Sequence, residues 1–328
     1  MRLEDVRGRL LISFVIALAV VLGLVFYADL SKTLAAFARF QWLYIAPILG
    51  LTLLNYLLRF VKWHFYLHQI GVRNLHPWDS LLMFFSGLSM VMTPGKIGEW
   101  LKSYLLREST GTPFSRSAPI IVAERLTDAV AMLILASGGL LISGVGWQVL
   151  VLVLLLALAV VAVARYRPLA MRLLRCGEST PVISKRMRHV HEFYESSYTL
   201  FGLRNLLAAI GLGFVSWSGE CIAFYLVLIG LGQEPSVMLV VKASFILAAS
   251  TLAGSLFLLP GGLGVAEGGI TGLCQALVGM TKDLAVASTL LIRFCTLWFG
   301  VSLGLIMLMI FTRRLPSLTS TGRADARG

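Results

Sequence analysis

The sequence predicts an all-α polytopic membrane protein, and two observations lead to this class. First, 58% of the 328 residues are hydrophobic and only 13% are charged, with a mean hydropathy of +0.85. A soluble domain carries about 25% charged residues, so that class is excluded. Second, the apolar residues form long continuous runs, whereas a membrane β-barrel alternates apolar and polar residues.

The net charge of +12 would suggest nucleic-acid binding in a soluble protein. Here the basic residues cluster between apolar runs, as they do in the cytoplasmic loops of membrane proteins. No nucleic-acid-binding motif is present. We therefore expect no nucleic-acid partner.

Six apolar runs are long enough to cross a bilayer, which takes about 20 helical residues. The first run follows a charged start, as in a signal peptide. It exceeds the roughly 7–15 apolar residues of such a peptide, so we expect an uncleaved span. The six predicted spans are Leu10–Ala28, Trp42–Leu58, Ala118–Ile142, Trp147–Ala164, Asn205–Gly230 and Leu284–Phe311.

Basic residues orient these spans. They precede the first span, fill the segment 165–204 and follow the last span, and few fall on the opposite side. Because Lys and Arg are enriched in cytoplasmic loops, we predict that both termini are cytoplasmic. The expected location is the bacterial inner membrane.

Two further apolar segments do not fit simple spans. Ser80–Met92 would form about 20 Å of helix, too short for a hydrocarbon core of about 30 Å. With Pro94–Leu106 it predicts a re-entrant hairpin over residues 80–106, because basic residues flank both sides. The second segment, 237–280, is long enough for either two crossings or a re-entrant pair, and both remain open.

The two hairpins carry matching motifs, "TPGKIGEW" and "LPGGLGVAEGG". Their prolines are 166 positions apart, and each is followed about thirty residues later by an arginine in an apolar run. The first unit starts outside and the second inside, which predicts an inverted-topology repeat of the kind found in transporters. The helix-break residues are Pro94, Gly95, Gly98, Pro260, Gly261, Gly262 and Gly264.

A helix break inside a bilayer must face protein or a watery cavity, because bare backbone groups are not tolerated in hydrocarbon. The alternative is a packing kink or an interfacial loop. The predicted divisions are 1–41 (first span and outer loop), 42–164 (first repeat), 165–204 (basic loop), 205–312 (second repeat) and 313–328 (cytoplasmic tail).

Charged residues near these breaks are the candidate path for a polar headgroup. Ionisable groups inside a membrane are costly and usually face a cavity or each other. Glu220 is the most isolated charge within a span and a candidate for proton or ion coupling, and Glu267 and Arg293 are expected to pair. The candidates are Lys96, Glu99, Lys102, Glu124, Arg125, Asp128, Glu220, Glu267 and Arg293.

Each group also has a structural interpretation. The segment from Lys96 to Lys102 repeats charges every three residues, as a solvated interfacial helix also does. The charges from Glu124 to Asp128 could form a structural ion-pair cluster, and Glu220 could hydrogen-bond nearby serines.

Catalytic and metal motifs are not evident. His64 and His68 have the spacing of a metal pair, but the adjacent glutamate and a third ligand are missing. The chain has neither a Walker A loop nor a Gly-x-Ser-x-Gly elbow. We therefore expect no catalytic residues, cofactor or metal ion.

The segments "TPGKIGEWLKSYLL", "AERLTDAV" and "LLPGGLGVAEGGI" followed by "LLIRFCTLW", in this order, resemble the transmembrane domain of lysylphosphatidylglycerol synthases and its stand-alone relatives. The resemblance covers nearly the whole chain and implies lipid translocation: full-length members make aminoacylated phosphatidylglycerol and move it to the outer leaflet. Some stand-alone relatives are associated with hopanoid or glycolipid pathways. Full-length members carry a synthase domain, whereas only a short polar tail follows Phe311, so aminoacyl transfer is not implied.

The leading hypothesis is a flippase-like transporter that moves a polar-headgroup lipid between leaflets without ATP hydrolysis. The basic candidates would offset phosphate charge, and the acidic ones would contact a cationic headgroup or carry protons. The lipid could be a phospholipid, an aminoacyl-phospholipid, or an isoprenoid or glycolipid. Two alternatives stay open: a membrane-embedded lipid-modifying transferase, and a non-catalytic partner of a separate lipid synthase.

Overall fold

The computed structural model describes residues 18–24, 26–92, 97–143, 147–166, 187–256 and 260–325, and every regular element in these ranges is a helix. The predicted all-α class is therefore confirmed. Four helices in this part are long and apolar enough to cross a membrane: Trp42–Gln69, Leu203–Gly230, Val237–Ser255 and Lys282–Arg314.

Three of these four helices coincide with predicted spans, and Val237–Ser255 is the first leg of the segment left open above. The predicted spans 118–142 and 147–164 lie in helices α6 (Phe114–Ser143) and α7 (Trp147–Arg165). Of the predicted first span, residues 10–17 and 25 lie outside the described residues, as do Pro94, Gly95 and Lys96.

The first half of the fold consists of α3 (Ile45–Gln69), α4 (Pro77–Leu88), α5 (Ile97–Thr110), α6 and α7. His76 caps α4 by accepting a hydrogen bond from the backbone N–H of Trp78, and Pro77 occupies the first turn, where its missing N–H costs nothing. Helices α4 and α5 pack against each other as a hairpin of two short helices.

The second half consists of α11 (Leu203–Gly230), α12 (Val237–Leu256), α13 (Val265–Leu273), α14 (Lys282–Arg293) and α15 (Phe299–Asp325). A π-helical turn, Phe294–Trp298, joins α14 to α15. Between α12 and α13, the glycines at 261, 262 and 264 have φ of 58°, 71° and 86°. Side chains with a Cβ rarely adopt this region, which explains why the break uses glycine.

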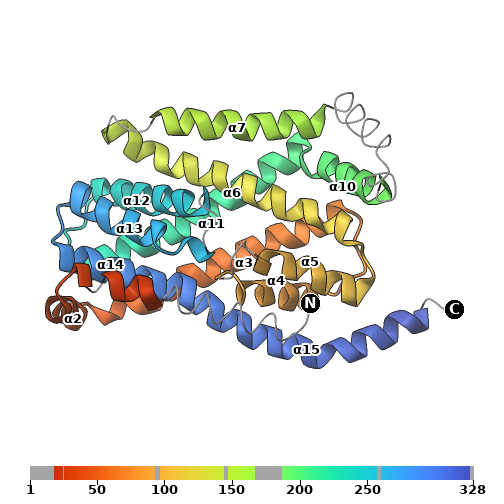
Figure 1. Cartoon of the computed structure of the whole chain (residues 1–328), viewed down its shortest axis with the longest axis horizontal. Helices are drawn as coiled ribbons and strands as arrows, with labels where there is room; N and C mark the ends of the chain where they lie inside the picture. Colours follow the sequence, from red (N-terminus) through yellow and green to blue (C-terminus); the bar gives the residue numbers. More distant parts are fainter. Residues whose placement is uncertain are drawn as a thin grey trace.

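The two halves interlock. Helix α3 packs along α11, α4 packs on α15, and α12 packs on α6, so the first helix of each hairpin lies against a long helix of the other half. Figure 1 shows the hairpins in opposite halves of the long axis, with α4 and α5 on the right and α12 and α13 on the left. Residues of both hairpins nevertheless line one common cavity.

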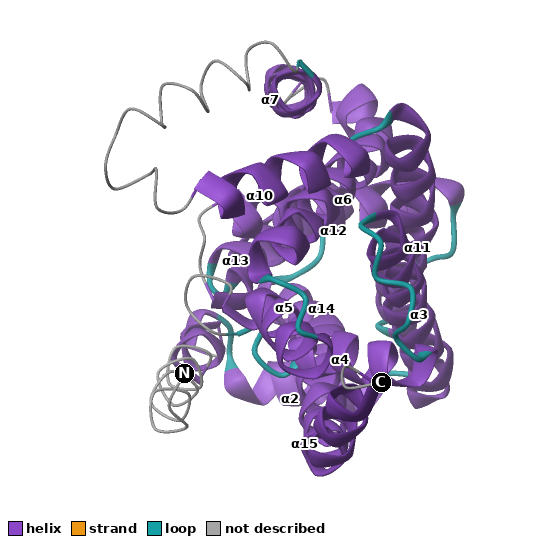
Figure 2. Cartoon of the chain, turned by 90° about the vertical axis from the view of Figure 1, so that its right-hand side faces the viewer, coloured by secondary structure: helices purple, strands orange, loops and turns teal. Residues whose placement is uncertain are grey.

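Two helices flank this arrangement. Helix α2 (Leu30–Arg39) begins at Asp29, whose carboxylate caps it, and packs on α14. Helix α10 (Met187–Leu200) occupies part of the predicted basic loop and lies across α6 (Figure 2). Its Glu192 accepts a 2.6 Å hydrogen bond from the Ser115 hydroxyl at the start of α6.

Candidate functional site

Each hairpin carries a glutamate that forms an ion pair with an arginine of the helix that follows the hairpin, α6 or α14. In the first half, Arg125 Nε lies 3.2 Å from Glu99 Oε2. In the second half, Arg293 Nε lies 2.6 Å from Glu267 Oε1, as expected from the sequence. In both pairs the glutamate is in the first turn after the break, and the arginine follows 26 positions later.

The second pair also holds the helix break itself. Arg293 Nη2 donates a 2.7 Å hydrogen bond to the carbonyl oxygen of Gly261. Glu267 Oε2 accepts a 2.6 Å bond from the backbone N–H of Gly264. Backbone groups freed by a break need partners inside a low-dielectric environment, and this pair supplies them. The break, the glutamate and the arginine therefore form one structural unit.

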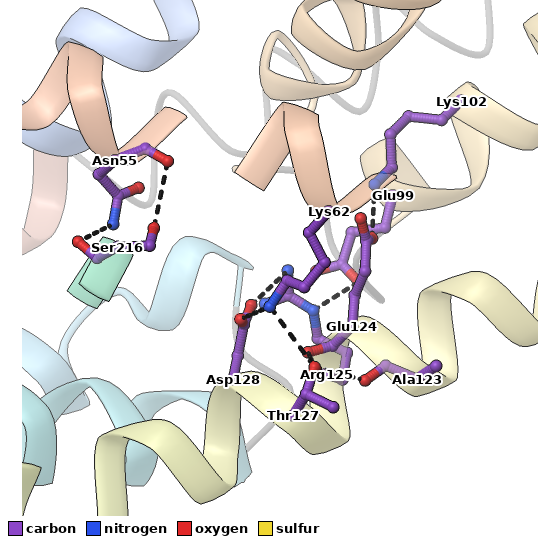
Figure 3. A network of polar contacts seen from close by, with 10 residues as sticks. All are labelled: Asn55, Lys62, Glu99, Lys102, Ala123, Glu124, Arg125, Thr127, Asp128 and Ser216. Atoms are coloured by element: carbon purple, nitrogen blue, oxygen red, sulfur yellow. Dashed lines mark hydrogen bonds and ion pairs between the residues drawn. The ribbon is translucent and has the colours of Figure 1, made fainter. Parts of the chain in front are cut away.

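Further charges surround the first pair (Figure 3). Lys102 Nζ lies 2.6 Å from Glu124 Oε2, and Lys62 pairs with Asp128. Arg125 Nη2 lies 3.7 Å from the other oxygen of Asp128. The cluster at 124–128 thus forms an ion-pair network, as the structural interpretation of that segment expected.

Lys102 is buried and also faces two aromatic rings. Its Nζ lies 4.6 Å from the ring centre of Trp63 and 5.1 Å from that of Phe84. Cation–π contacts of this kind strengthen when they are desolvated. Lys102 is therefore part of a packed interior and does not lie on a solvated interfacial face.

A cavity of about 160 Å³ lies where the two hairpins and the helix pair α3–α11 meet. Both halves contribute charged side chains to its wall, together with Tyr56 and Trp217. The charged residues lining it are Arg59, Glu99, Lys102, Arg125, Glu220 and Arg293.

Sequence reasoning missed Arg59 and Lys62. Both follow the predicted end of their span at Leu58, but the helix continues to Gln69. Lys62 is 1% exposed. The sequence signal that could have identified it is that its neighbours, Val61 and Trp63, are both apolar. Lys62 pairs with Asp128 inside the helix bundle.

Glu220 lines the cavity and is only 7% exposed. Its carboxylate makes no hydrogen bond or ion pair with another residue of the described ranges. The hydroxyls of Ser216 and Ser218 donate to the carbonyl oxygens of Asn55 and Phe214 instead. Hydrogen bonding to these serines, the structural alternative for Glu220, does not occur.

An apolar groove of about 410 Å³ adjoins this polar cavity. Its walls come from helical residues 18–24, α2, the 3-10 turn Trp42–Tyr44, α13, α14 and the π-helical turn after α14. They include Phe37, Trp42, Phe294 and Trp298. Glu267 and Arg293 are its charged residues, and Arg293 lines both the groove and the polar cavity.

The histidine pair has no metal-site geometry. His64 Nδ1 lies 3.0 Å from the Ser80 hydroxyl, and His68 Nδ1 lies 2.9 Å from the carbonyl oxygen of His64. Across the described ranges, no group of three His, Cys, Asp or Glu side chains could hold a metal ion.

The fold and the charged cavity define a multi-pass helical membrane protein built around two broken helical hairpins. The family model described as the lysylphosphatidylglycerol synthase TM region matches residues 14–304, and the chain belongs to this family. This confirms the resemblance carried by the Pro-Gly motifs.

Two archaeal relatives match nearly the whole chain, and a third matches a shorter segment. It is similar to a UPF0104 membrane protein of Methanothermobacter thermautotrophicus, with 25% identity over 96% of this chain and 97% of the relative. A UPF0104 membrane protein of Pyrococcus horikoshii is 23% identical over 90% of this chain and 95% of the relative. A third, also from M. thermautotrophicus, is 31% identical over 39% of this chain and 38% of the relative.

Proposed function

We propose that the chain is a flippase-like lipid transporter that moves a polar-headgroup lipid between leaflets without ATP hydrolysis. The observation that carries this proposal is the position of Arg293, which lines both the charged cavity and the apolar groove. A lipid has a polar headgroup joined to hydrocarbon chains, and these adjoining sites match its two parts. A solute without chains would have no use for the groove.

The charges of the cavity suit a phosphate-bearing headgroup. Arginine is well adapted to phosphate because its planar guanidinium can donate two parallel hydrogen bonds. Before a lipid binds, Arg125 and Arg293 are each paired with a glutamate. A phosphate would therefore replace a carboxylate as the partner of the arginine and would not bind an unpaired cation. Such exchange limits the cost of moving the headgroup through the protein interior.

The first hairpin is proposed to be re-entrant, and the two hairpins are proposed to form an inverted repeat. Helix α4 has 12 residues and α5 has 14, which gives about 18 Å and 21 Å, both shorter than a hydrocarbon core of about 30 Å. The matched ion pairs and the exchanged packing of α4 and α12 support the repeat. The basic residues support cytoplasmic termini and a place in the bacterial inner membrane.

Leaflet exchange in liposomes tests this function. The purified chain is reconstituted with fluorescent phospholipid, and the outer-leaflet label is reduced chemically in the absence of ATP. We expect exchange with the natural sequence and its loss with Glu99→Gln and Glu267→Gln. Glu108→Gln, on an exposed face of α5, is the matched control, and thermal unfolding of each variant checks its folding.

Other outcomes would contradict the proposed transport path or favour one of the alternative functions. Exchange unaffected by both substitutions would refute a path through the hairpins. A chemically altered lipid after incubation with the pure protein would favour the transferase. Absence of exchange with every lipid class, together with co-purification of a lipid synthase, would favour the non-catalytic partner.

A further inference from the structure

Two charges of the central cavity stand apart from the rest. Within the described part of the chain, four ion pairs neutralise the other charges at or next to the cavity: Glu99–Arg125, Lys102–Glu124, Lys62–Asp128 and Glu267–Arg293. Arg59 and Glu220 line the same cavity, and neither forms an ion pair with a residue of the described ranges. The guanidinium of Arg59 lies over the ring of Trp217, 5.7 Å from its centre.

The packing of α3 on α11 places the backbones of these two residues on opposite sides of the helix crossing. Asn55 Nδ2 donates to the carbonyl oxygen of Ser216, and the Ser216 hydroxyl donates to the carbonyl oxygen of Asn55. Gly213 lies near Lys62 and Gly219 near Leu51, so the helices run antiparallel. Arg59 and Glu220 each lie four residues beyond this crossing in opposite directions, roughly 12 Å apart along the axis.

We propose that the cavity binds one phosphate-bearing anion together with one proton, with Arg59 and Arg293 contacting the phosphate and Glu220 taking the proton. This inference rests on the proposed function, because it concerns the same cavity. It adds the charge class of the headgroup and a coupling ion. The step is a simple association in which the Glu220 carboxylate becomes a carboxylic acid.

The charge balance of the cavity is the physical reason. With Glu220 ionised, the four pairs and the Arg59–Glu220 couple sum to zero, so an anion would enter a neutral site beside a carboxylate. With Glu220 protonated, Arg59 leaves one uncompensated positive charge. Buried charges are tolerated when they are compensated, so one monoanion completes the balance.

The surroundings of Glu220 allow this role. Asp128 is neutralised by Lys62, and Arg293 is shared with Glu267. Among the described residues that line the cavity, Arg59 is therefore the cation without an ion pair. The only charged side chain of the adjacent α12, Lys242, lines a separate pocket. The titratable and charged groups whose interactions reach Glu220 are Tyr56 and Arg59 from α3, Asp128 from α6, Arg293 from α14, and Cys221 beside it.

The proposal predicts a definite pH dependence. Anion binding should strengthen as the pH falls through the titration of Glu220 and weaken about tenfold per pH unit above it, because one proton binds with each anion. A zwitterionic phosphatidylcholine headgroup brings no net charge, so it should bind more weakly and without proton uptake.

Calorimetric titration of the full-length protein in detergent tests the linkage. Dioctanoyl phosphatidylglycerol is the probe, and two buffers of different ionisation enthalpy report the protons taken up on binding. We expect about one proton per lipid for the natural sequence and none for Glu220→Gln, which should bind tightly at all pH values. Glu108→Gln should behave like the natural sequence. Arg59→Gln should weaken binding at least tenfold, and Arg59→Lys should restore part of it.

Several results would overturn the proposal: lipid binding without proton uptake, or uptake that persists in Glu220→Gln. Glycerophosphoglycerol, the same headgroup without chains, separates the two sources of phosphate. If it bound as well as the lipid, the proton linkage would stand and the lipid function would fail. If lipid exchange occurred in liposomes without any proton linkage, the function would stand and the proposal of a coupled proton would fail.

Discussion

Removing the carboxylate of Glu267 should destabilise the protein far more than the same change at Glu99. Both residues occupy equivalent positions in the two hairpins, but their surroundings differ. Glu267 uses both carboxylate oxygens, one on Arg293 and one on the backbone N–H of Gly264, each at 2.6 Å. In Glu267→Gln, the amide NH₂ would face one of these donors, and Arg293 would lose its countercharge.

The magnitude follows from burial. The side chains of Glu267 and Arg293 are 5% and 14% exposed, and breaking a buried pair from one side costs about 3–5 kcal/mol. The Glu99–Arg125 pair is longer, at 3.2 Å, and its side chains are 15% and 31% exposed. Arg125 also retains Asp128 nearby. We therefore expect about 1–2 kcal/mol for Glu99→Gln, since partial exposure screens the loss.

Reversible unfolding of the purified protein in mixed micelles, followed by denaturant titration, measures both variants. Amide hydrogen exchange at Gly264 gives a local readout, because its N–H loses an acceptor in Glu267→Gln. We expect faster exchange there in Glu267→Gln and no change in Glu99→Gln. Equal unfolding free energies for the two variants, with Gly264 still protected, would refute the reasoning that Glu267 secures the break.

Three further predictions concern the break, the buried lysine and the flanking helix. Gly261→Ala should cost about 1–2 kcal/mol in unfolding free energy, because the φ of this residue is +58°. Gly268→Ala is the control, because nothing lies within 4 Å of the new Cβ. It should be neutral or slightly stabilising by the same measurement. Lys102→Met should lower the unfolding free energy by about 3 kcal/mol, because it leaves the buried Glu124 without a partner. The double variant with Glu124→Leu should recover most of this loss in denaturant titration. If it recovered nothing, the loss would not come from the unpaired Glu124. A hydrogen bond from the Ser115 hydroxyl lowers the pKa of Glu192 below its ordinary value. The stabilisation that the Glu192 carboxylate gives to the packing of α10 on α6 is therefore present at neutral pH and is lost as the pH falls through the lowered pKa. A ¹³C NMR titration that gave the ordinary pKa would exclude that contact.

Much of this protein follows from local chemistry. A bilayer forces continuous apolar helices, so composition and run length predict the all-α membrane class and most spans. The Pro-Gly break is equally local, since the positive φ at Gly261 admits few other residues. The carboxylates and arginines near the breaks are visible because charges in apolar runs are rare.

Pairing and the cavity were decided by tertiary structure. Within the chain, Lys102 is nearer to Glu99 than to Glu124, yet it pairs with Glu124 because the packing of α5 on α6 brings that carboxylate to it. Lys62 reaches Asp128 only because α3 extends to Gln69 and crosses α6.

The two cavity charges without an ion pair show the same difference between what the sequence predicts and what packing decides. The sequence identified Glu220 as an isolated carboxylate, but it did not identify Arg59 as the other charge of the cavity. The charges that come near Arg59 depend on how α3 and α11 are rotated and aligned against each other, and these helices are far apart in the chain. The Asn55–Ser216 contact fixes that alignment. The sequence alone therefore determined the elements and the unusual residues, while packing determined which charges cancel, because neutralisation requires approach within a few ångströms.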